Sequence, residues 1–201
     1  MFRGSTSFLK DEQTPVVSPA ALDLVERARQ YSPEHPLYVV AIGAITNIAS
    51  ALLLDPGIAE NIVVVWLGGH ALHNPDTQEF NMRQDVAAAR VVMGSEAPFV
   101  QLPCLGVVSS FRISGPELEF WLKGKNAIAE YLAQNTITAA ERYAAKMAWT
   151  RCLWDVTAVA WLMNDGNRFM SSRITPPHLP NYENQYEMQE GGRPMQYVYE
   201  I

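Results

Sequence analysis

The chain has 201 residues, enough for one α/β domain with a sizeable core, and its 48% hydrophobic and 18% charged residues are ordinary for a globular protein. A net charge of −6 without any Lys/Arg run argues against a nucleic-acid partner, and no apolar run is long enough to span a membrane. The N-terminus lacks the apolar core of a signal peptide, and Cys104 and Cys152 lie in apolar surroundings without CxxC spacing. We therefore expect a cytoplasmic protein with two buried free thiols.

Residues 1–17 are polar and contain nothing that predicts a strand. Ser18 and Pro19 then suit the cap and the first position of a helix, and apolar residues at helical spacing continue it to about Tyr31. We expect an irregular N-terminal segment followed by an amphipathic helix.

Three apolar runs follow, at residues 37–42, Ile62–Leu67 and Phe99–Leu102. Continuous apolar runs of this length are typical of strands that are buried on both faces. Helical patterns at residues 46–55 and Val86–Met93 alternate with them. This βαβαβ order predicts an α/β fold with a mostly parallel sheet and flanking helices, in a single domain over residues 1–201.

The second half of the chain reads as more helical, with predicted helices at residues 117–122, 127–133 and 139–149. Residues 152–163 (CLWDVTAVAWLM) are apolar nearly all round, which predicts a buried helix. Residues 195–201 alternate and predict an edge strand.

The loop after the second strand is the clearest candidate for a binding site. It begins at Gly68-Gly69 and contains Glu79-Phe80-Asn81. In extended backbone Glu79 and Asn81 would face one side while Phe80 turned into the core, and a carboxylate with an amide suits the vicinal hydroxyls of a sugar. The alternative is a solvated loop with local turn bonds.

Other residues carry weaker signals. Asp155 is a carboxylate in an apolar stretch, and it could pair with Arg151, cap a helix or bind a metal. His70 and His73 could be acids or ligands, but exposed or packed histidines fit their spacing better, since no third zinc ligand is near.

Three motifs, in order, make the chain similar to the inosine-uridine-preferring nucleoside hydrolases. Residues 40–49 (VAIGAITNIA) resemble the family's strand-to-helix turn G-x-L-T-N-(I/V)-A. Leu67-Gly68-Gly69, the Glu79-Phe80-Asn81 triplet and Asp85 resemble its M-G-G, E-F-N and D-P-E-A-A segments. Residues 154–160 (WDVTAVA) resemble H-D-P-x-A-V-A.

The resemblance implies cleavage of the N-glycosidic bond of a ribonucleoside to ribose and free base, in purine or pyrimidine salvage. A calcium ion would activate the attacking water, with the Asp155 carboxylate and the Ile42 carbonyl among its ligands. Glu79 and Asn81 would bind the ribose hydroxyls, with Asn74 as a further contact. Trp154 stands where many members have a histidine, so it would stack on the base instead of donating a proton.

The chain departs from the family at its start. The family's first strand carries a D-x-D-x-x-x-D-D cluster that supplies the general base and further calcium ligands, and this chain has none; Asp11 and Glu12 follow no strand. We therefore expect a fold that is incomplete at the N-terminus, an absent catalytic aspartate, weak calcium binding and no activity from this chain alone.

Two alternatives to an enzyme domain that binds a ribonucleoside remain open. The chain could be a non-catalytic remnant that keeps the fold for assembly, for example as a homo-oligomer through an exposed sheet edge. A different α/β hydrolytic enzyme would need a nucleophile or base that these residues do not show.

Overall fold

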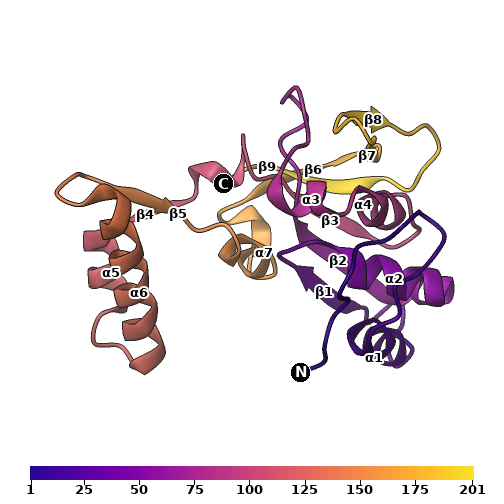
Figure 1. Cartoon of the computed structure of the whole chain (residues 1–201), viewed down its shortest axis with the longest axis horizontal. Coiled ribbons are helices and arrows are strands. Elements are labelled where there is room, and N and C mark those ends of the chain that lie inside the picture. The colour runs from indigo at the N-terminus through magenta and orange to yellow at the C-terminus, as the bar shows by residue number, and fades with distance from the viewer.

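A five-stranded sheet forms the centre of the protein in the computed structural model, which describes all 201 residues (Figure 1). The strand order is β1-β2-β3-β9-β6. Its strands are β1 (Leu37–Ala41), β2 (Ile62–Leu67), β3 (Phe99–Leu102), β9 (Met195–Glu200) and β6 (Ser171–Thr175). The first four run parallel and β6 is antiparallel to β9. The predicted α/β class with a mostly parallel sheet is confirmed.

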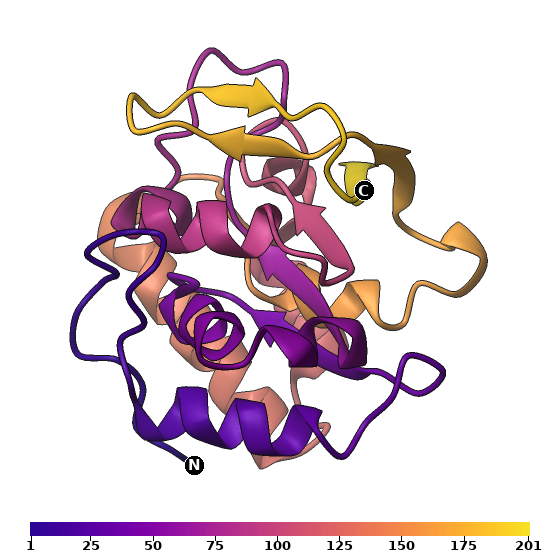
Figure 2. The same ribbon diagram turned by 90° about the vertical axis from the view of Figure 1, so that its right-hand side faces the viewer.

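One face of the sheet is thickly covered by helices. They are α1 (Pro19–Ala28), α2 (Thr46–Leu54), α3 (Phe80–Gln84) and α4 (Val86–Met93). In Figure 2 the side of the molecule on which these helices lie faces the viewer. α1 begins as predicted, because the Ser18 side chain accepts the Ala21 N–H and Pro19 occupies the first turn. A cluster of 25 buried residues, which includes Trp66 and Met82, fills this side.

The other face is thinly covered. Its core cluster has only 12 buried residues, and the helix packed there is α7 (Val156–Trp161). Val156 and Val159 on that helix are half-exposed. A helix is therefore confirmed for Val156–Trp161, but its predicted length over residues 152–163 and its predicted burial are wrong. Residue 152 belongs to β5 (Thr150–Cys152), and only one side of the short helix meets the sheet. No second layer covers the outer side.

The predicted edge strand at the C-terminus is also wrong in its position. β9 lies between β3 and β6, and Met195, Tyr197 and Val198 are buried. The strand that covers its outer side, β6, has the polar sequence SSRIT, which gives little sign of a strand. The free edge on the opposite side of the sheet is β1.

A helical arm, residues 112–152, projects from the body (Figure 1). It consists of a two-stranded neck, β4 (Arg112–Ser114) with β5, and the helices α5 (Gly115–Leu122) and α6 (Ala127–Ala144). The two predicted helices at 127–133 and 139–149 are one continuous helix, and it ends at Ala144.

The remaining elements are short. They are the hairpin of β7 (His178–Pro180) with β8 (Tyr186–Met188) and the 3₁₀ turns Pro56–Asn61, Val108–Ser110 and Asp165–Asn167. None of the helices combines the length and apolar composition that a bilayer span requires.

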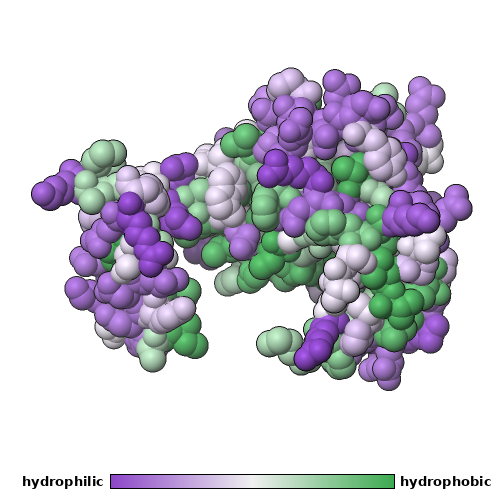
Figure 3. All heavy atoms as spheres, in the orientation of Figure 1, coloured by the Kyte–Doolittle hydropathy of each residue, from purple (hydrophilic) through white to green (hydrophobic).

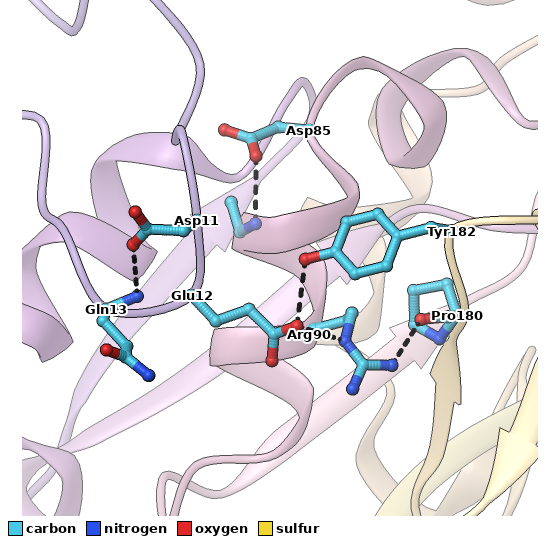
Figure 4. A network of polar contacts seen from close by, with 8 residues as sticks. Asp11, Glu12, Gln13, Asp85, Arg90, Pro180 and Tyr182 are labelled. Atoms are coloured by element: carbon cyan, nitrogen blue, oxygen red, sulfur yellow. Dashed lines mark hydrogen bonds and ion pairs between the residues drawn. The ribbon is translucent and has the colours of Figure 1, made fainter.

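The N-terminal segment has no helix or strand before Pro19, as expected, yet it is tied to the body. Glu12 forms an ion pair with Arg90 at 2.6 Å and accepts the Tyr182 hydroxyl at 2.9 Å (Figure 4). The Leu9 N–H donates to Asp85 at 2.9 Å. The two early acids thus serve the fold: Glu12 binds α4, and Asp11 accepts N–H groups of its own turn, which lowers the pKa of its carboxyl.

Candidate functional site

The candidate site begins where β2 ends in two glycines. A Cβ on Gly68 would lie 2.3 Å from the Trp66 ring. Gly69 has φ +77°, and a Cβ there would lie 2.1 Å from the Tyr186 hydroxyl. Side chains are thus excluded at both positions, and the chain can turn sharply from the strand into the loop of residues 70–79.

Glu79 is the residue that closes this loop. It is 5% exposed and caps α3, accepting the backbone N–H of Asn81 and of Met82, each at 2.9 Å. Its Oε2 also accepts the Gly69 N–H at 3.0 Å. The carboxylate therefore joins the end of β2 to the start of α3.

Asn81 lies two residues after Glu79, on the first turn of α3, and is buried. Its Nδ2 donates to the Leu67 carbonyl at 2.9 Å, while its Oδ1 makes no hydrogen bond. Burial of both side chains contradicts the solvated loop of the alternative, whereas the local turn bonds that it also predicted are present at Glu79. The extended backbone is wrong as well, because the helix begins at Phe80 and leaves that ring 66% exposed instead of in the core.

Four of the predicted site residues, Glu79, Asn81, Trp154 and Asp155, meet in one cavity of about 370 Å³ at the carboxyl end of β2. Such a volume suits a small ligand. Phe80 and Trp154 provide aromatic surface, and Glu79, Asn81 and Asp155 provide hydrogen-bonding groups. The other lining residues are Leu67, His70, Gln78, Arg83, Cys104 and Leu105.

Several of these lining residues were not found from the sequence. Phe80 and Arg83 enter the cavity rim because α3 is a helix, in which residues three apart share a face, and the Arg83 guanidinium lies 6.0 Å from the Phe80 ring centre. His70 lines the cavity and its Nδ1 lies 3.4 Å from the Leu105 N–H donor, whereas His73 does not line it.

The two cysteines are free and buried, as expected. Burial raises the pKa of the Cys104 thiol, and the nearby negative charge of Glu79 raises it further. Burial also raises the pKa of Cys152. Cys104 therefore contributes a neutral, apolar wall to the cavity, not a nucleophile.

Asp155 stands just before α7 and is exposed. It makes neither the ion pair with Arg151 nor a capping hydrogen bond, so its carboxylate is uncommitted at the cavity rim. Asn74 is placed elsewhere: its Nδ2 donates to the Leu105 carbonyl at 3.2 Å, and the residue does not line the cavity.

The donor set does not fit a calcium ion. Calcium takes six to eight oxygen ligands. Here Glu79 is engaged by three N–H groups, which leaves Asp155 as the one free carboxylate of the cavity. Ile42 lies just beyond the end of β1 and lines a separate groove, and no three His, Cys, Asp or Glu residues are grouped to hold a metal.

Comparison with known proteins identifies the family. The sequence model described as inosine-uridine preferring nucleoside hydrolase matches residues 2–192. The chain belongs to this family. No curated protein matches the sequence of this nucleoside hydrolase family member.

Solved structures share its fold. An inosine-uridine preferring nucleoside hydrolase from Bacillus anthracis superposes with a TM-score of 0.66 at 21% identity, covering 92% of this chain and 61% of its own. A purine-preferring ribonucleoside hydrolase from Gardnerella vaginalis gives 0.72 at 22% identity, with 91% and 61% covered. An inosine-guanosine nucleoside hydrolase gives 0.68 at 18% identity, with 94% and 64% covered. This nucleoside hydrolase family member therefore spans about three fifths of the length of these structures.

Proposed function

We propose that the cavity at the carboxyl end of β2 binds a ribonucleoside and that this chain is the substrate-binding part of a nucleoside N-ribohydrolase site. The observation that carries the proposal is the meeting of Glu79, Asn81, Trp154 and Asp155 in one cavity. These residues come from two segments more than 70 positions apart in the chain.

Each group has a defined part in this proposal. The free Oδ1 of Asn81 and the remaining lone pair of Glu79 Oε1 accept hydrogen bonds from ribose hydroxyls. Trp154 and Phe80 stack on the planar base. Asp155 places a negative charge beside the sugar, where it favours an oxocarbenium-like transition state. Asn74 would contact ribose only if its bond to the Leu105 carbonyl opened.

The hydrolytic step itself is proposed to be absent from this chain alone. Cleavage needs an activated water, and the cavity offers neither a free carboxylate pair nor enough oxygen ligands to hold calcium through Asp155 and Ile42. We expect weak calcium binding and negligible nucleoside cleavage. The alternative of a non-catalytic remnant that serves assembly makes a different prediction, because such a remnant does not need to bind a nucleoside.

Calorimetric titration of the chain with inosine tests the binding. We expect heat of binding from the wild type, and at least a tenfold weaker affinity for Trp154→Ala and Asp155→Ala, because each removes a contact to base or sugar. Asp165→Ala removes an exposed carboxylate outside the cavity and serves as the matched control. No heat with the wild type, or equal affinity in all four proteins, would contradict the proposal.

The catalytic part is tested separately by a reducing-sugar assay of inosine and uridine with calcium present. Ribose release by the purified chain would overturn the proposed inactivity and leave the binding proposal standing.

A further inference from the structure

We propose that two copies of this chain interlock, the helical arm of each entering the hollow between the arm and the body of the other. The arm and the body are the two parts defined above, residues 112–152 and the rest of the chain. The argument rests on three observations: how α6 distributes its side chains, what the hollow exposes, and how charge is divided between the two parts.

The arm buries its smallest side chains and exposes its largest. α5 and α6 pack mainly on each other, and neither core cluster of the body includes a residue from them. Their seam is made of Leu118 and four alanines: Ala129, Ala133, Ala140 and Ala144. Two helices that bury little more than alanine gain little hydrophobic free energy from each other.

A second face of α6, beside the alanine seam, carries an exposed apolar stripe. Ile128, Tyr131, Leu132 and Tyr143 lie at positions i, i+3, i+4 and i+15, which fall on one side of a helix, and all are exposed. Tyr131 is 67% exposed while Ala133, two residues on, is 5% exposed. A helix with a broad apolar surface of this kind is normally covered over all of that surface. The stripe therefore needs a partner that the arm's own body does not provide.

The body offers a second uncovered apolar surface. Between the arm and the body lies a hollow, and apolar residues are prominent along its body side (Figure 3). α7 lies on the side of the body toward the arm (Figure 1), with Val156 and Val159 more than half exposed and Met163 exposed beyond its end. Stripe and α7 surface are thus both uncovered within a single copy. A second copy inserted arm-first covers both at once.

Charge favours contact between the arm of one copy and the body of the other. The arm has six Lys or Arg and four Glu residues, which give it a net charge of +2. Since the whole chain has a net charge of −6, the body has a net charge of −8. Lys123 and Lys125 stand at the tip, between α5 and α6, which is the end that would enter first. Opposite charges on the docking parts steer association and orient it. Reciprocal insertion gives a closed two-fold dimer, the commonest symmetry of homo-oligomers.

Sedimentation equilibrium of the full chain over a concentration series tests the arrangement. We expect a monomer–dimer equilibrium in the wild type. Tyr131→Lys on the stripe and Val159→Lys on α7 should each raise the dimer Kd by about 30-fold, because each buries an unpaired charge in the interface. Gln134→Lys, an exposed position on α6 outside the stripe, is the matched control and should leave the Kd unchanged.

An equimolar mixture of Tyr131→Lys and Val159→Lys distinguishes interlocking from other dimers. A mixed dimer keeps one wild-type arm-to-body contact, so it should form more tightly than either variant alone. Because both positions are exposed in one copy, thermal melts of the dilute monomers should coincide with wild type. A wild type that stays monomeric, a dimer that depends on Tyr131 but not Val159, or a mixture no tighter than its components would overturn the proposal.

Discussion

Replacement of Glu79 by alanine should destabilise the protein strongly, because this carboxylate holds the loop together. The substitution removes the cap of α3 and the bonds to the N–H groups of Asn81 and Met82. It also leaves the Gly69 N–H without a partner in a buried position. Loss of a cap costs about 1 kcal/mol and an unsatisfied buried donor about 2 kcal/mol. Together they predict a loss of about 3 kcal/mol in the free energy of unfolding.

Urea unfolding followed by far-UV circular dichroism measures this change. A loss of about 3 kcal/mol should lower the midpoint by about 1.5 M, taking a slope of about 2 kcal/mol/M. Glu79→Gln keeps one acceptor oxygen and should fall between alanine and wild type. Gln78→Ala changes the exposed neighbour, whose side chain makes no hydrogen bond, and is the matched control. An unfolding midpoint for Glu79→Ala equal to that control would refute the reasoning and leave the carboxylate with a ligand-binding role only.

Three further predictions concern buried polar groups. Asp85→Ala should lower the unfolding free energy by about 3 kcal/mol and make residues 1–17 accessible to limited proteolysis. The reason is that Asp85 accepts hydrogen bonds from the Leu9 N–H, the Thr46 hydroxyl and the Ala88 N–H, and an unchanged digestion pattern would contradict it. Tyr186→Phe should lower the unfolding free energy by about 1–2 kcal/mol in thermal melts, since its hydroxyl donates to the His70 carbonyl and accepts from Gln101, and no change in Tm would show that neither bond stabilises the fold. Both thiols should react slowly with a thiol reagent in the native protein and fully in denaturant. Because burial raises their folded-state pKa, the free energy of unfolding should also fall as pH rises above about 8.5, where the unfolded thiols ionise; a flat pH profile would contradict the pKa shift.

The sequence predicted the central part of the sheet well, because the signals there are local. Apolar runs at β1, β2 and β3, separated by helical patterns, impose the parallel βαβαβ order through the right-handed crossover. The cap at Ser18 and the start of α4 after Asp85 were also predictable, since a cap depends on residues three positions away. Glu79 and Asn81 stood out as a polar pair beside the glycines that end β2.

Tertiary contacts decided the rest. Whether β9 lies at an edge depends on the polar strand β6, which forms because it finds a partner and not because of its own propensity. Phe80 points outward because a helix begins there. The Glu79 carboxylate caps that helix by accepting two of its N–H groups, and it also accepts the N–H of Gly69, ten residues earlier in the chain. The exposure of α7 and of the α6 stripe has the same origin: an apolar pattern shows that a face needs cover, but only the packing of distant segments determines whether the chain itself provides it.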